Sequence, residues 1–62
     1  MVNINSATAV ELQTLQGIGP RKAATIIDHR KVHGQFKEIQ QLLYVNGIGP
    51  RIFQQISPHV TV

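Results

Sequence analysis

The sequence predicts a small all-α domain made of two copies of one helical unit. The segment LQGIGPR at residues 15–21 returns as VNGIGPR at residues 45–51, an offset of 30 residues. Glycine and proline interrupt each copy in its middle, so each unit contains two helices with a break between them. No stretch alternates apolar and polar residues for long, and we therefore expect no sheet. The 62 residues suffice for one domain, residues 1–62, with a first unit at 9–33 and a second at 39–57.

The repeat extends beyond the five identical residues Gly-Ile-Gly-Pro-Arg. Apolar residues recur at the same offset on both sides of the break, which predicts equivalent places for them in the two units. The matching pairs are Leu12 and Leu42, Leu15 and Val45, Ile18 and Ile48, and Ile26 and Ile56.

The first helix is predicted over residues 9–16. Thr8 and Glu11 have the spacing of a capping box, in which each side chain accepts a hydrogen bond from the other residue's backbone. Ser6 is an alternative cap. Leu12 and Leu15 fall on the inner face of this helix. Gly17 then ends it in the left-handed conformation that is typical of helix C-termini.

A second helix is predicted from Pro20 to His33, with Gly34 as its stop signal. Gly19 is suited to the cap, and Pro20 to the first helical position, where its missing N–H has no cost. The apolar stripe of this helix comprises Ala23, Ile26, Ile27 and the stem of Arg30. For Arg30 we expect a hydrogen bond to a hairpin or helix-end carbonyl, with a phosphate contact as the alternative.

The second unit repeats the plan. Phe36 enters the core, a short helix covers residues 39–45, and Pro50 opens a final helix that Pro58 ends near Ser57. Its buried side consists of Ile52, Phe53 and Ile56. The opening residues and the tail are predicted to be extended, with Ile4 and Val60 at the edges of the core.

The charge balance indicates a polyanionic partner. Six Lys and Arg stand against three Asp and Glu, which gives a net charge of +3 and a pI of about 10.0. A basic surface of this kind suits nucleic acid first and an anionic membrane second. Most of the basic residues lie between positions 21 and 37, namely Arg21, Lys22, Arg30, Lys31 and Lys37. For Lys31 and Lys37 we expect long-range attraction from solvated charges.

Several function classes are excluded or disfavoured. The chain has no cysteine, which excludes disulfides, thiol nucleophiles and cysteine-based metal centres. It has no apolar run near the ~20 residues that cross a bilayer, and MVNINSATAV is not a signal peptide. No pair of carboxylates or Ser-His-Asp set indicates catalysis, so we expect no enzyme. His29 and His33 have metal-compatible spacing, but a basic flank is the preferred interpretation.

Each predicted hairpin has the chemistry of a phosphate site. A helix start leaves backbone N–H groups without partners and carries a partial positive charge, so anions bind there. Glycine lets a phosphate approach the backbone closely. The predicted DNA-binding residues are Gly17, Ile18, Gly19, Arg21 and Lys22 in the first unit, and Gly47, Ile48, Gly49 and Arg51 in the second. Ile52 also offers its N–H, while the side chains of Ile18 and Ile48 are expected to fill the core.

These residues resemble a known DNA-binding motif. LQGIGPRKA is similar to a helix-hairpin-helix motif, and YVNGIGPRI to a second one, which together resemble a tandem helix-hairpin-helix domain with a linking helix and a pseudo-twofold axis. More narrowly, NIN at 3–5, ELQTLQGIG at 11–19, AATIIDHR at 23–30 and the final HVTV resemble the C-terminal domain of the competence DNA receptors, the ComEA family. The chain departs from this family at Glu38, where a Ser or Thr cap is common. It also has Ile52 where the first unit has Lys22, so we expect the first hairpin to dominate binding.

The resemblance implies a monomeric domain that binds double-stranded DNA without strong sequence preference. It implies a role in DNA uptake, outside the cytoplasmic membrane and anchored there by another segment, with no small-molecule substrate. It also implies K⁺ or Na⁺ at each hairpin, held by the carbonyls of Gln13, Leu15 and Ile18 and by those of Leu43, Val45 and Ile48; no other metal or cofactor is expected. The alternatives are an accessory domain in DNA repair or recombination, and a protein-interaction module that binds no nucleic acid.

Overall fold

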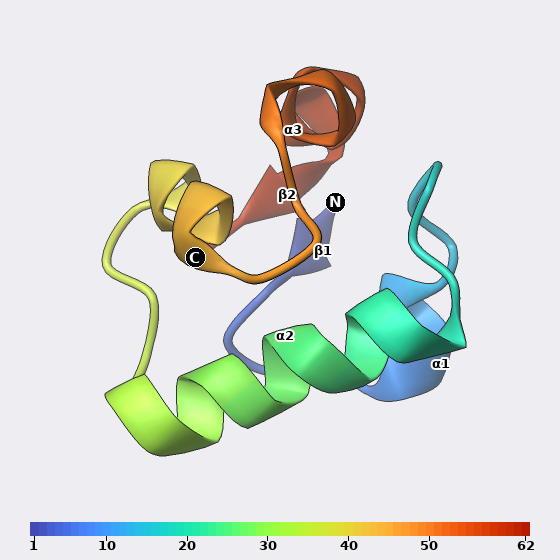
Figure 1. Ribbon diagram of the computed structural model, residues 1–62. Coiled ribbons are helices and arrows are strands. Elements are labelled where there is room, and N and C mark those ends of the chain that lie inside the picture. The colour runs from blue at the N-terminus through green and yellow to red at the C-terminus, as the bar shows by residue number, and fades with distance from the viewer.

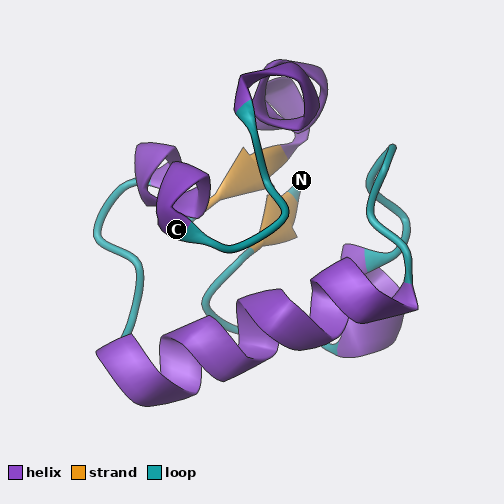
Figure 2. Ribbon diagram, viewed as in Figure 1, coloured by secondary structure: helices purple, strands orange, loops and turns teal.

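Helix α2 is the longest element and lies along one side of the molecule, across from helix α3 (Figure 1). The computed structural model describes all residues, 1–62. The elements in chain order are strand β1 (Val2–Asn3), helix α1 (Ala9–Leu12), helix α2 (Pro20–His33), 3₁₀ helix η1 (Ile39–Tyr44), helix α3 (Pro50–Ile56), 3₁₀ helix η2 (Ser57–His59) and strand β2 (Val60–Thr61). The fold is mostly helical (Figure 2), and none of its helices is long and apolar enough to cross a membrane.

Helix α1 begins as predicted and ends early. Thr8 Oγ1 accepts a hydrogen bond from the Glu11 N–H at 3.2 Å, and Glu11 Oε1 accepts one from the Thr8 N–H at 2.9 Å. This reciprocal pair confirms the capping box and leaves Ser6 without that role. The predicted extension to residue 16 is wrong, because the chain tightens after Leu12 into three-residue turns. Leu15 N–H donates to Leu12 O at 3.1 Å, and Thr14 Oγ1 donates to Glu11 O at 2.6 Å.

Helix α2 has its predicted bounds. Pro20 occupies the first turn and Gly19 is extended before it, with φ −94° and ψ −170°. Gly34 follows the helix with φ +86°, a conformation that side chains with a Cβ rarely adopt, so the helix ends there.

The second unit differs from the prediction in helix type. Residues 39–44 form a 3₁₀ helix and not an α-helix. Glu38 occupies the N-cap position, and the Gln41 side chain reaches back to it: Gln41 Oε1 accepts a hydrogen bond from the Glu38 N–H at 3.3 Å. Helix α3 ends at Ile56, and Pro58 lies inside the following turn η2, where its fixed φ is tolerated near a helix start.

A short parallel strand pair joins the two ends of the chain. Val2 pairs with Val60 and Asn3 with Thr61, and the Ile4 N–H donates to Thr61 O at 2.9 Å. The prediction of extended ends is confirmed for Val2–Asn3 and Val60–Thr61, but Ile4 lies in a turn and His59 in η2. The expectation of no sheet was wrong. Strands of two residues carry no readable alternation, and their partners lie at opposite ends of the sequence.

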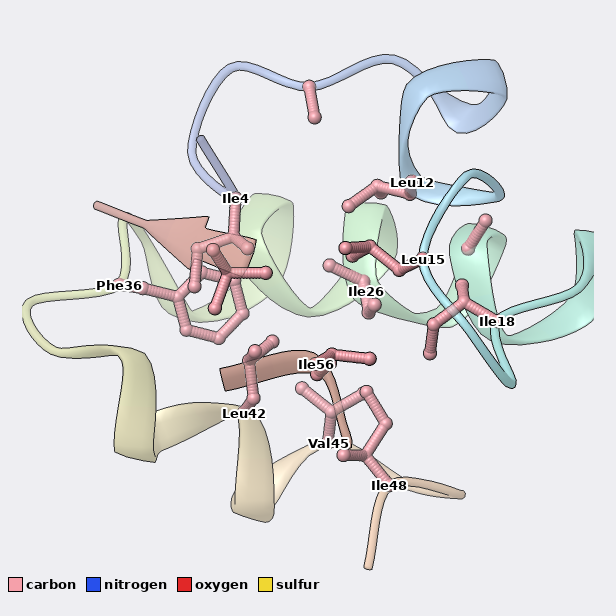
Figure 3. Packing of buried hydrophobic residues seen from close by; sticks show 13 residues of the cluster. Ile4, Leu12, Leu15, Ile18, Ile26, Phe36, Leu42, Val45, Ile48 and Ile56 are labelled. Atoms are coloured by element: carbon pink, nitrogen blue, oxygen red, sulfur yellow. The ribbon is translucent and has the colours of Figure 1, made fainter. Parts of the chain in front are cut away.

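One core of 13 buried residues is shared by both units (Figure 3). All four pairs of the 30-residue repeat are buried in it, with Leu12, Ile26, Leu42 and Ile56 wholly inaccessible to solvent. Ile4, Phe36 and Val60 belong to the same cluster, as predicted, and Ala7 and Ala23 complete it. Figure 3 shows Ile18 and Ile48 pointing into this cluster from the turns that precede α2 and α3. Ile18 and Ile48 therefore anchor the two turns to the core.

Candidate nucleic-acid interface

Two turns with nearly the same backbone geometry precede helices α2 and α3. In the first hairpin, residues 15–19, Gly17 has φ +85°, and Gly19 has φ −94° and ψ −170°. In the second hairpin, residues 45–49, Gly47 has φ +94°, and Gly49 has φ −101° and ψ −178°. The positive φ at Gly17 and Gly47 requires glycine in practice. The 30-residue sequence repeat is therefore also a repeat of backbone conformation.

Ile18 and Ile48 hold the turns and do not offer free donors. The Ile18 N–H donates to Leu15 O at 3.1 Å, and the Ile48 N–H donates to Val45 O at 3.1 Å. Both side chains are 4% exposed, so their expected place in the core is confirmed. The sequence prediction counted these two N–H groups among the phosphate donors; in this structure each is already committed within its own turn.

The remaining predicted N–H groups are free. Those of Gly19, Arg21 and Lys22 make no hydrogen bond within the protein, and the same holds for Gly49, Arg51 and Ile52. They belong to the first turns of α2 and α3, where the partial positive charge of a helix start is concentrated. Each hairpin thus presents three unpaired donors, and Pro20 or Pro50 stands among them without an N–H.

The space in front of Gly19 and Gly49 is open. A Cβ added to either residue would meet no atom within 4 Å, and neither glycine has a positive φ. Nothing inside the protein therefore requires glycine at these two positions. A ligand that approaches the backbone from outside gives a physical reason for the missing side chain.

The two hairpins lie next to one another, each against the helix of the other unit. A Cβ on Gly47 would stand 3.7 Å from Lys22 Cε, and one on Gly17 would stand 3.7 Å from Ile52 Cγ1. Lys22 and Ile52 are equivalent positions in the repeat. Arg21 and Arg51 are both exposed beside these contacts.

This arrangement changes how the basic side chains are divided. The sequence placed Lys22 with the first hairpin and left the second with Arg51 alone. In the structure the Lys22 side chain lies along the second hairpin, and the apolar Ile52 lies along the first. The reason is that each hairpin packs against the helix of the other unit, which sequence spacing does not reveal. Each hairpin thus has one exposed arginine, and the only lysine of the two sites lies beside the second hairpin.

Carbonyl groups at each hairpin retain free lone pairs. Those of Gln13 and Ile18 accept no hydrogen bond within the protein, and that of Leu15 accepts one. In the second unit the carbonyls of Leu43 and Ile48 accept none, and that of Val45 accepts one. Oxygen donors of this kind fit a hard cation.

Other basic residues have structural roles. Arg30 donates to Ile4 O at 2.9 Å and to Ala7 O at 2.7 Å. Arg30 thus bonds carbonyls, but they lie in the N-terminal segment; the expected hairpin or helix-end partner was wrong. His29 stacks on Phe36, with ring centroids 5.2 Å apart, and lies 4.4 Å from His33. Burial lowers the pKa of His29, and the neighbouring His33 lowers it further.

The fold and these two glycine turns define a helix-hairpin-helix domain. A family described as the helix-hairpin-helix motif matches residues 1–61, and the chain belongs to this family. ComE operon protein 1 of Bacillus subtilis is 45% identical over all 62 residues, which confirms the resemblance to the ComEA family. An uncharacterized protein of Haemophilus influenzae is 53% identical over 49 residues, or 77% of this chain.

A related sequence also occurs in animals. Human endonuclease/exonuclease/phosphatase family domain-containing protein 1 is 34% identical over 59 residues, or 95% of this chain. The chain spans only part of each relative: 30% of the Bacillus protein, 44% of the Haemophilus protein and 10% of the human protein. Sequences similar to this chain thus make up very different shares of the proteins that contain them.

Proposed function

We propose that this chain is a tandem helix-hairpin-helix domain that binds double-stranded DNA through its backbone amides. The two hairpins each hold a phosphate, one from each strand across the minor groove. The pseudo-twofold between the units suits a duplex, whose two backbones are themselves related by twofold axes. The free N–H groups of Gly19, Arg21 and Lys22 form one site, and those of Gly49, Arg51 and Ile52 form the other.

The observation that carries this proposal is that each hairpin lies against the helix of the other unit. Lys22 lies beside Gly47, and Ile52 beside Gly17, so two sites of matching geometry stand together on one molecule. Each site combines unpaired N–H groups, an open glycine and an exposed arginine. A lone helix–helix turn explains the positive φ of Gly17 and Gly47 and permits glycine at the caps Gly19 and Gly49. A side-chain cap such as Ser, Asp or Asn would stabilise each helix start better, whereas glycine leaves the backbone open to a ligand.

The proposed binding depends little on base sequence. Phosphate contacts position a protein on DNA but carry no sequence information themselves. The donors in both sites are backbone groups, flanked by Arg21, Arg51 and Lys22, whose charges favour any phosphate.

The test is to titrate two unrelated duplexes of ~20 base pairs with the protein at 50 and 200 mM salt. Binding is measured by fluorescence anisotropy of the labelled DNA. If about four to six phosphates are neutralised, log K falls against log salt with a slope of roughly −4 to −5. Similar affinity for both duplexes and a loss of more than tenfold across that range support the proposal. Absence of binding to both duplexes at 50 mM salt contradicts the proposal and favours the alternative of a protein-interaction module.

A monovalent cation belongs to the same proposal. K⁺ or Na⁺ would be held by the carbonyls of Gln13, Leu15 and Ile18, and a second ion by those of Leu43, Val45 and Ile48. Such an ion adds positive charge beside the phosphate. Replacing KCl by tetramethylammonium chloride at constant ionic strength should then weaken DNA binding, because that cation is too large for the carbonyls. Equal binding in both salts argues against the ion.

We further propose a role in DNA uptake, as a monomeric, non-catalytic domain outside the cytoplasmic membrane. The similarity to ComE operon protein 1 supports this context. Anchoring to the membrane and any further activity would belong to parts of the protein outside these 62 residues. A gene disruption that lowers transformation without slowing growth supports uptake.

A second candidate is an accessory role in DNA repair or recombination. The observation in its favour is the presence of this domain in endonuclease/exonuclease/phosphatase family domain-containing protein 1, where it covers only a tenth of the chain. A disruption strain that is sensitive to DNA damage but transforms normally favours this alternative.

A further inference from the structure

A groove of about 360 Å³ adjoins the second hairpin. Its walls come from helix α2, from the last residue of η1 and from the start of the second hairpin. The lining residues are Thr25, Asp28, His29, Val32, His33, Tyr44 and Asn46. Because Asn46 directly precedes Gly47, the groove begins where the proposed phosphate site ends. We call it the tyrosine groove.

The first unit has a hollow at the equivalent place. It is lined in part by Thr14, Gln16 and His59. The 30-residue offset relates Thr14 to Tyr44, Gln16 to Asn46, and His59 to His29. Each hairpin therefore has a hollow beside it. The hollow of the second hairpin is lined by Tyr44, whereas the equivalent residue in the hollow of the first is Thr14.

The tyrosine groove is suited to an aromatic ligand. Tyr44 is 77% exposed and Val32 is 68% exposed, so two large apolar surfaces stand free at its rim. On the α2 side, His29 is stacked on the buried Phe36 with their ring planes 7° apart, which ties that wall to the core. His33 adds a second imidazole at 4.4 Å from the first. The groove thus has an exposed aromatic side chain, Tyr44, from one segment and two imidazoles from α2 among its lining residues.

The charges of the groove disfavour a phosphate inside it. None of its seven lining residues is Lys or Arg, and Asp28 brings a carboxylate. A carboxylate repels phosphate but accepts hydrogen bonds from the amino groups of bases. Asn46 and Thr25 both donate and accept. The lining thus matches a nucleobase and not the DNA backbone.

From these observations we infer that the tyrosine groove binds one unpaired base next to a duplex held by the second hairpin. Paired bases are stacked within the helix and present no free face, whereas an unpaired base can stack on an aromatic side chain. The inference rests on the proposed function and makes it more specific: the preferred DNA is a duplex with a single-stranded extension.

The test compares three DNAs of the same duplex sequence: blunt, with a three-nucleotide extension, and with a three-residue abasic extension. The abasic extension supplies the same phosphates without bases. Stacking of one base should make the normal extension bind about tenfold more tightly than the abasic one. Tyr44→Thr, which installs the residue of the first unit, should abolish this difference and leave blunt-duplex affinity within about twofold.

A direct readout is available because the chain has one tyrosine and no tryptophan. Base stacking should quench Tyr44 fluorescence with the normal extension and leave it unchanged with the abasic one. Val10→Thr removes another exposed apolar side chain, 75% exposed, and serves as the matched control that keeps the tenfold difference. Equal affinity for the two extensions, or a difference that survives Tyr44→Thr, overturns the inference while blunt-duplex binding stands. Loss of binding to all three DNAs overturns the proposed function as well.

Discussion

The guanidinium of Arg30 donates a hydrogen bond to the carbonyl oxygen of Ala7 at 2.7 Å, across 23 positions of sequence. A second nitrogen of the same group donates to Ile4 O at 2.9 Å. These bonds tie the N-terminal segment to helix α2, just before Thr8 caps helix α1. They also occupy the arginine, which explains why a basic residue can lie on the apolar side of α2.

Arg30→Met should therefore lower stability more than DNA affinity. The variant keeps the apolar stem but leaves two carbonyls without a charged donor, which costs about 2–3 kcal/mol in the free energy of unfolding. Urea denaturation measures this loss. Lys37→Met, which removes the same charge from an exposed position, is the control and should be nearly neutral. If Arg30→Met weakens DNA binding far more than Lys37→Met does in folded protein, Arg30 contacts phosphate after all.

Gly19→Val and Gly49→Val should each weaken DNA binding about tenfold, the equivalent of one lost charge-assisted contact. The valine side chain points into open space in the free protein, so it blocks phosphate approach without a clash. Anisotropy titrations measure the affinity, and thermal unfolding checks the fold.

Gly34→Ala is the control for Gly19→Val and Gly49→Val, because it replaces a glycine that lies outside both hairpins. Gly34 has φ +86° and lies at the far end of α2, so alanine there should cost about 1 kcal/mol in stability. DNA affinity of the folded variant should not change. The glycine hypothesis is wrong if Gly34→Ala and Gly19→Val lower affinity equally.

Two single variants, at positions 22 and 52, test how the basic charge is divided between the two hairpins. Lys22→Ile should weaken DNA binding and reduce the salt slope by about one, because one ammonium beside the second hairpin is lost. Ile52→Lys places an ammonium beside the first hairpin and should increase the slope by about one. The comparison is made by anisotropy over a series of salt concentrations. Unchanged slopes in both variants would show that neither position faces phosphate.

Acidification should destabilise the fold through His29. Its pKa in the folded state lies below the usual 6.5, because burial and His33 disfavour the charged form. As the pH falls from about 7.5 to 5.5, the unfolded chain takes up a proton that the folded chain resists, so the free energy of unfolding decreases. Denaturation at both pH values measures the change. His29→Gln should reduce the pH dependence, whereas His59→Gln, at the equivalent place in the repeat, should retain more of it.

The repeat predicted the core of this domain with good accuracy. Leu12, Ile26, Leu42 and Ile56 are wholly buried, because apolar residues at equivalent places in two like units face the same interior. The positive φ of Gly17 and the bounds of α2 were also predicted, since both follow from local preferences of glycine and proline.

Features that depend on contacts between distant segments were not predicted. The pairing of Val2 with Val60 rests on two residues at each end, too few for a strand pattern. The position of Lys22 beside Gly47 results from the packing of one unit on the other. The tyrosine groove likewise forms only when η1 approaches α2. The hydrogen bond from the Ile18 N–H to Leu15 O is local, but it was missed because helix α1 was predicted to continue to residue 16.

The strand pair between Val2 and Val60 has a mechanical consequence. The strands run parallel, so tension applied at residues 1 and 62 pulls them along their length in opposite directions. Their hydrogen bonds are then loaded together in shear, and not broken one after another as in peeling. If the chain is pulled at both ends while it binds DNA, the hairpins should stay folded until the hydrogen bonds between β1 and β2 break.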